Sequence, residues 1–217
     1  MRLPILCLSF AVLAACTLDP GAGGGTEPRP VIHQVTETPS PVSYAATKDG
    51  GFTVPALDPA KIPLAYQRTV VQNPIPEEAP GTILVDTQNR FLYLVQDPST
   101  ALRYGIGVGR EGFGWSGEAV ADRKARWPTW TPPPEMIKRQ PELERWKDGR
   151  PGGPRNPLGA RAIYLAQGGR DTGFRIHGTP EWRSIGSNAS SGCFRMIQQD
   201  VIDLHARVTP GAKVIVR

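Results

Sequence analysis

The sequence has few cysteines, few aromatic residues and no dense run of basic residues. Of its 217 residues, three are cysteine and 7% are aromatic, whereas glycine and proline number 24 and 23. So many turn-forming residues argue against a mainly helical protein and favour a mainly β fold. The formal net charge of +5 suits contact with anionic polymers, but no run of Lys or Arg predicts a nucleic-acid partner.

Long apolar runs are also missing, except at the N-terminus. The apolar stretch from Leu3 to Ala15 suits a signal peptide and is too short to span a bilayer. It ends in Leu-Ala-Ala-Cys, which resembles the bacterial lipobox. We expect residues 1–15 to be a lipoprotein signal peptide and Cys16 to carry lipid at the periplasmic face of a membrane; a plain secretory signal is the alternative. Thr17, in place of an Asp, favours the outer membrane over the cytoplasmic membrane.

This N-terminus leaves the mature protein with one thiol. Cys7 lies in the segment to be removed and Cys16 would be lipidated, so Cys193 remains without an evident partner. Outside the cytoplasm cysteines usually form disulfides. An unpaired cysteine there predicts a function for it.

Residues 16–60 are rich in Pro, Gly, Thr and Ser without a sustained apolar period, and we expect a flexible tether. One domain should then occupy residues 61–217, with ordered structure beginning between Ile62 and Pro80. Helix signals are limited to residues 135–146, interrupted at Pro141, and residues 200–208. Strands are expected at residues 83–85, 91–95, 102–109, 161–166, 174–177 and 213–216.

The predicted fold is a β-sandwich or barrel with one or two short helices and a long irregular insertion between residues 110 and 160. The insertion contains three tryptophans and three basic residues that suit a wall for an anionic peptide, and local packing is the alternative. These residues are Trp115, Trp127, Trp130, Arg123, Lys124 and Arg126.

The sequence does not predict a dinucleotide-binding site or a metal site. The G-x-G-x-x-G pattern at residues 107–112 would need a following helix to bind a dinucleotide, and Gly114 and Gly117 interrupt one. We expect a turn there and no cofactor. The three histidines have no ligand-like spacing with one another or with Cys193, so no metal site is expected.

The informative segment is "FRIHGTPEWRSIGSNASSGCFRM", residues 174–196. His177 ends an apolar run, and Cys193 follows a polar loop. A nucleophilic cysteine needs a base or cation that lowers its pKa, which His177 can supply. Gly192 would admit a substrate carbonyl and Arg195 would provide positive charge for an oxyanion. A buried histidine beside an inert cysteine is the alternative.

These residues resemble the L,D-transpeptidase catalytic domains, also called the YkuD or ErfK family. The shared pattern is His-Gly, a loop, and Ser-x-Gly-Cys-x-Arg, present at residues 177–178 and 190–195. Segments such as "PGTILVDTQNRFLYLV" and "NPLGARAIYL" also resemble the family in family order, so the resemblance covers about residues 60 to 217. Many members have a second histidine where this chain has Ser191.

The resemblance implies a β-sandwich that crosslinks peptidoglycan. Cys193 would attack the carbonyl after meso-diaminopimelate in a stem tetrapeptide, D-alanine would leave, and an amine would resolve the thioester. His177 would be general base and acid, the Gly192 amide (with that of Cys193) and Arg195 would stabilise the oxyanion, and Ser190 would orient His177.

The acceptor is left open. A stem peptide, water or a lysine of an envelope protein would fit, and a non-catalytic lipoprotein that binds the cell wall is the alternative outside enzymes. The implied partners are peptidoglycan stem peptides and, through the lipid, a membrane.

Overall fold

The computed structural model describes residues 43–110 and 114–217. Thirteen strands occur in these ranges: β1 (Thr47–Asp49), β2 (Phe52–Val54), β3 (Thr69–Gln72), β4 (Ile83–Asp86), β5 (Phe91–Val95), β6 (Thr100–Gly105), β7 (Val108–Gly109), β8 (Gly117–Arg126), β9 (Arg161–Gln167), β10 (Arg170–Gly178), β11 (Asn188–Ser190), β12 (Phe194–Met196) and β13 (Lys213–Val216). The two α-helices of this part are α1 (Pro134–Arg139) and α2 (Gln198–Arg207). Short 3₁₀ helices cover Pro59–Lys61, Leu64–Tyr66, Pro141–Trp146 and Trp182–Ser184.

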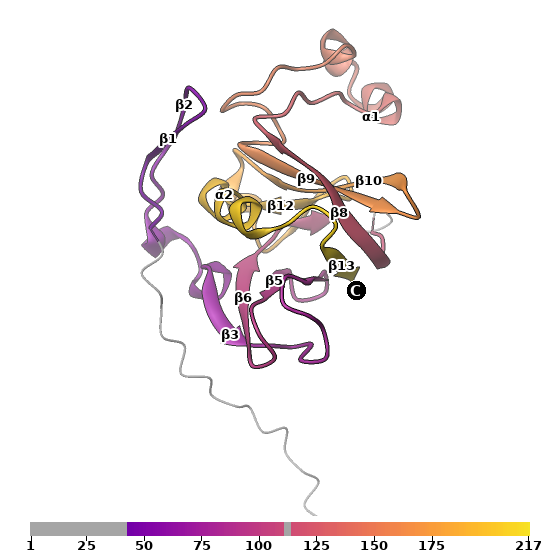
Figure 1. Ribbon diagram of the computed structural model, residues 1–217. Helices are drawn as coiled ribbons and strands as arrows, with labels where there is room; N and C mark the ends of the chain where they lie inside the picture. Colours follow the sequence, from indigo (N-terminus) through magenta and orange to yellow (C-terminus); the bar gives the residue numbers. More distant parts are fainter. Residues whose placement is uncertain (1–42, 111–113) are drawn as a thin grey trace, which may run out of the picture. The chain divides into compact units, whose positions relative to one another are not determined.

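Nine of these strands form one sheet, which confirms the mainly β fold. Their order is β12-β10-β9-β8-β13-β4-β5-β6-β3, while β1-β2 and β11-β7 form separate two-stranded sheets (Figure 1). Residues from distant strands, such as Leu92 in β5 and Ile163 in β9, belong to the same buried cluster. The sheet must therefore curve over on itself around one core, as a sandwich does.

Helix α2 covers β9 and β10 on the core side (Figure 1). Its Val201 and Leu204 have no exposed surface and join the main core. Burial of each such side chain stabilises the fold by about 1.5–3 kcal/mol. The helix begins two residues before the predicted start at residue 200. No helix in the described ranges has the length and apolar character needed to cross a bilayer.

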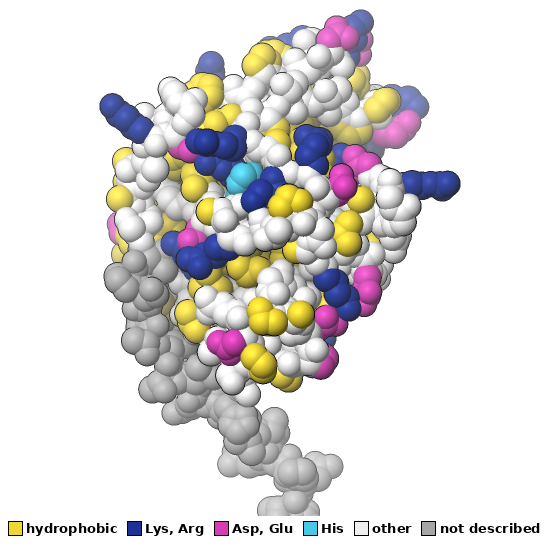
Figure 2. Space-filling view, in the orientation of Figure 1, with side chains coloured by type: hydrophobic (Ala, Val, Ile, Leu, Met, Phe, Trp, Pro, Cys, Tyr) yellow, Lys and Arg dark blue, Asp and Glu magenta, His cyan; other side chains and the backbone are white. Residues whose placement is uncertain are grey.

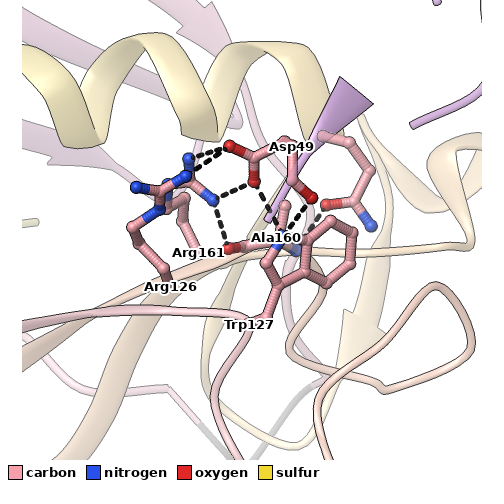
Figure 3. A network of polar contacts seen from close by, with 6 residues as sticks. Asp49, Arg126, Trp127, Ala160 and Arg161 are labelled. Atoms are coloured by element: carbon pink, nitrogen blue, oxygen red, sulfur yellow. Dashed lines mark hydrogen bonds and ion pairs between the residues drawn. The ribbon is translucent and has the colours of Figure 1, made fainter. Parts of the chain in front are cut away.

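The tether prediction is wrong for residues 43–60, which are ordered against the domain. Strands β1 and β2 form an antiparallel hairpin. Asp49 of this hairpin accepts hydrogen bonds from Arg161 at 2.6 and 2.8 Å, from Arg126 at 2.8 Å and from the Trp127 indole at 2.7 Å (Figure 3). We call this group the Asp49 clamp.

A second contact holds the same segment. Tyr44 is 2% exposed and donates to the buried carboxylate of Asp200 over 3.2 Å. The composition of residues 43–60 is that of a linker, but its contacts with the domain, which include Asp49, Tyr44 and the Phe52 ring against Trp127, anchor it. The signal peptide, the lipidation at Cys16 and the tether up to residue 42 lie outside the described residues.

The irregular insertion predicted for residues 110–160 is wrong in its first part. Strand β8 lies inside the sheet between β9 and β13. Its buried positions include Ala119 and Ala121, which are too small to give a strong apolar signal among charged neighbours. The remainder carries α1, which ends before Pro141 as predicted, and projects from the sheet at the top of Figure 1.

Candidate active site

Two parallel strands at one edge of the large sheet place His177 and Cys193 near each other, two residues apart in register. The register of β10 and β12 pairs Ile176 with Phe194 and His177 with Arg195. Ile176 and Phe194 are buried in the core. Because side chains alternate along a strand, His177, Arg195 and Cys193, which directly precedes β12, lie on the opposite face. We call this the catalytic face.

His177 is held as a neutral base. Its side chain is almost fully buried, and Nδ1 lies 2.6 Å from the carbonyl oxygen of Gly178. A carbonyl can only accept, so Nδ1 carries the proton and Nε2 is the basic nitrogen. Burial, with smaller effects of the charges of Arg195 and Arg175, lowers the pKa of His177 to about 4. The ring is therefore uncharged at neutral pH and able to accept a proton.

Cys193 is a thiol rather than a thiolate in this state. Burial raises the pKa of Cys193, although the backbone N–H of Arg175 donates to the sulfur and the nearby arginine charges oppose the rise. The Sγ atom also lies 3.9 Å from the Gly173 carbonyl oxygen. The expected lowering of this pKa by His177 is wrong, because a buried neutral imidazole supplies no positive charge.

This state predicts how Cys193 responds to pH. Its alkylation by iodoacetamide should be slower at pH 6.5 than that of free cysteine, and should rise through a midpoint above the free-thiol value of about 8.5. The measurement is mass spectrometry of the peptide that contains Cys193, with the urea-unfolded chain as the control. A fast rate that stays constant down to pH 5 would instead indicate a thiolate–imidazolium pair.

Ser190 shapes the loop that carries Cys193. Its hydroxyl donates to the Cys193 carbonyl oxygen at 2.6 Å and accepts from the Gly192 N–H at 3.1 Å. The predicted contact with His177 is not made, because the Gly178 carbonyl occupies Nδ1. Gly192 has φ +120°, where a side chain would be strained, so the turn requires glycine at this position.

The same contacts change the choice of oxyanion donor. The Gly192 N–H, which we expected to stabilise the oxyanion, is engaged by Ser190. No hydrogen bond in the described parts of the chain uses the Cys193 N–H. This amide is therefore the better placed donor of the two.

Arg195 is fixed from two sides. Its Nη1 is 2.8 Å from Glu181 Oε2, and its backbone exchanges hydrogen bonds with Gly107 at 2.8 and 2.9 Å. A Cβ at residue 107 would lie 2.7 Å from the Ser184 carbonyl oxygen, so the close approach requires glycine. Gly107 belongs to the G-x-G-x-x-G pattern, and its place beside Arg195 explains that glycine without a nucleotide.

Most of the predicted peptide wall is engaged in local packing. Lys124 donates to the carbonyl oxygens of His205 and Val208 at the end of α2, both at 2.6 Å. Arg126 and Trp127 belong to the Asp49 clamp. In Figure 2, Lys and Arg side chains gather around a histidine in the region where Figure 1 shows α2.

The aromatic residues Trp115 and Trp130 of that wall are half-buried, and Trp115 packs against the core. Trp115 stacks on Phe174 with ring centres 5.5 Å apart, and Trp130 pairs with Arg150 in an isolated bridge. Arg123, by contrast, lies over Tyr164 on the catalytic face.

Known proteins are similar in sequence to this chain. Residues 80–216 match the family model YkuD, described as the L,D-transpeptidase catalytic domain. The Escherichia coli K12 protein named Probable L,D-transpeptidase ErfK/SrfK is 33% identical over 142 residues, 62% of this chain and 43% of that protein. Probable L,D-transpeptidase YcfS of the same strain is 31% identical over 170 residues, 74% of this chain and 51% of its own length. The chain thus spans about half of these relatives.

One solved structure has a different name. A Brucella melitensis crystal structure, described as a probable carnitine operon oxidoreductase, is 50% identical to this chain. The match covers 72% of this chain and 96% of that one, with a TM-score of 0.50.

Proposed function

Since this chain belongs to the YkuD family of L,D-transpeptidase catalytic domains, we propose that it transfers a peptidoglycan stem peptide through a thioester on Cys193. The donor is a stem tetrapeptide, which loses its terminal D-alanine, and an amine of another stem accepts the acyl group. The observation that carries this proposal is a neutral His177, with Nδ1 held by Gly178, on the same sheet face as a thiol.

The chemistry follows from the protonation states. As Cys193 Sγ attacks the carbonyl carbon, its proton passes to Nε2 of His177, which becomes positively charged. The C–N bond to D-alanine then breaks and the imidazolium protonates the leaving amine. In the second half, the acceptor amine attacks the thioester, His177 takes its proton, and the thiol is regenerated. Ser191 cannot act as a base at neutral pH, so one histidine serves both halves.

The developing oxyanion needs donors near the thiol. We assign this role to the Cys193 N–H and to Arg195, whose positive charge is positioned by Glu181. The same charge helps to keep His177 neutral before the reaction by lowering its pKa. Arg195 thereby favours the base form of His177 in the free enzyme.

Water or an envelope-protein lysine could replace the acceptor stem, because both would use the same acylation step. We place the enzyme at the periplasmic face of a bacterial membrane, held by lipid on Cys16. Labelled palmitate should then be incorporated by the wild-type chain and not by Cys16→Ala.

The test is mass spectrometry of the full chain with disaccharide-tetrapeptide. We expect an adduct on Cys193 that has lost the mass of D-alanine, and a crosslinked dimer when an acceptor stem is added. An adduct with free tripeptide but no dimer would indicate a carboxypeptidase. If the wild-type chain forms no adduct, the proposed chemistry is wrong.

A further inference from the structure

Two arginines stack on one tyrosine beside the catalytic pair. Strands β8, β9 and β10 are neighbours, and their register places Arg123 opposite Tyr164 and Tyr164 opposite Arg175. The guanidinium carbon of Arg123 is 3.5 Å from the centre of the Tyr164 ring, and that of Arg175 is 4.4 Å from it. We call these three residues the arginine stack. Their geometry brings two like charges close together.

The stack begins next to the nucleophile. Arg175 precedes His177 by two residues in β10, so both side chains lie on the catalytic face. Its backbone N–H donates to the sulfur of Cys193. From there the stack crosses β9 to β8, and neighbouring strands are about 4.8 Å apart. The stack therefore extends from the thiol across two strand spacings, about 10 Å, and a peptide residue bound near the thiol can contact it.

The positive charge of the stack is only partly balanced. Arg175 makes two hydrogen bonds of 2.8 Å to Asp171, and Arg195 is paired with Glu181. No ion pair or hydrogen bond within residues 43–110 and 114–217 includes the exposed guanidinium of Arg123, and its charge acts only at longer range on the Asp171 carboxylate that pairs with Arg175. The ring holds this planar group by a cation–π contact while its N–H donors stay available. An unpaired, oriented arginine beside a second cation suits a carboxylate.

We propose that the arginine stack binds a carboxylate of the donor peptide, with Arg123 as the group that donates to it. This inference rests on the proposed function, because it assumes a stem tetrapeptide as donor. Such a peptide has two carboxylates near the scissile bond: that of the terminal D-alanine and that on the diaminopimelate side chain. The stack selects donors by this carboxylate, whereas Cys193 and His177 carry out the reaction.

The experiment compares protein variants with peptides that lack one carboxylate each. The proteins are wild type, Arg123→Gln, Arg123→Lys and Arg155→Gln, the last removing an exposed arginine outside the catalytic face. The peptides are the free tetrapeptide, its C-terminal amide and its side-chain amide. The rate of adduct formation on Cys193 gives kcat/KM for acylation.

We expect Arg123→Gln to lower kcat/KM about tenfold with the free tetrapeptide, mainly through KM, since a hydrogen bond to a charged group is lost. The loss of kcat/KM should be much smaller with the amide that lacks the bound carboxylate. This comparison identifies which of the two carboxylates the arginine stack binds. Arg123→Lys should recover part of the rate, and Arg155→Gln should match wild type. An equal loss with all three peptides, or no loss with any, overturns the proposal.

A binding measurement separates this proposal from the reaction. Calorimetric titration of Cys193→Ala and Cys193→Ala/Arg123→Gln with the same peptides needs no acylation. Weaker binding of the free tetrapeptide to the double variant supports the arginine stack even if the wild-type chain forms no adduct. Equal affinities overturn it even if transpeptidation is found.

Discussion

Replacing Cys193 by alanine should abolish the thioester adduct and lower D-alanine release by on the order of 10⁴-fold or more. The substitution removes the sulfur that forms the covalent bond, and no second free cysteine exists in the described residues to replace it. The measurement is D-alanine release together with intact-protein mass spectrometry. Unfolding temperature should change little, because the hydrogen bond from this thiol to the Gly173 carbonyl oxygen is long, at 3.9 Å.

The matched control for this prediction keeps the thiol and removes the base. His177→Gln should retain alkylation of Cys193 at high pH, but should lose most of the acylation rate, since nothing then accepts the thiol proton. An adduct of unchanged yield in Cys193→Ala would show that another residue is acylated and would contradict the mechanism.

Replacing Asp49 by alanine should lower the free energy of unfolding by about 3 kcal/mol. The Arg161 side chain is 6% exposed, and the substitution leaves its charge buried without a carboxylate. The melting temperature should fall by roughly 6–12 °C for a domain of this size. Because Asp49 lies in the segment predicted as tether, this result also tests whether that segment belongs to the domain.

A surface ion pair provides the control for Asp49. Glu135 and Lys138 form a bridge of 2.8 Å in which both side chains are about 70% exposed. Glu135→Ala should therefore cost less than about 0.5 kcal/mol. Similar melting temperatures for Asp49→Ala and wild type would mean that the hairpin is not anchored by its carboxylate.

The candidate residues His177 and Cys193 could be singled out from the sequence because their signal is local. His177 follows an apolar run, and Cys193 lies in a polar turn where an inert thiol has no reason to be. What failed was the assignment of hydrogen bonds. The Ser190 hydroxyl and the Gly178 carbonyl are both near the site in sequence, and only the fold determines which of them reaches Nδ1.

The predicted lowering of the Cys193 pKa was wrong for a related reason. Residue type predicts that a histidine can stabilise a thiolate, but burial decides whether that histidine is charged. The arginine stack was beyond prediction as well, since it depends on the register of three strands. Of these, β8 has too few apolar residues to be recognised as an internal strand.

The Asp49 clamp also has a mechanical consequence. Tension applied to the chain before residue 43 must pass through Tyr44 and the β1–β2 hairpin before it reaches the large sheet, because the chain is continuous in that order. Asp49 is joined to Arg126 at the end of β8 and to Arg161 at the start of β9, three residues along each strand from Arg123 and Tyr164. A pull on the N-terminal side would therefore load the Tyr44–Asp200 hydrogen bond to α2 first and the Asp49 clamp on β8 and β9 after it.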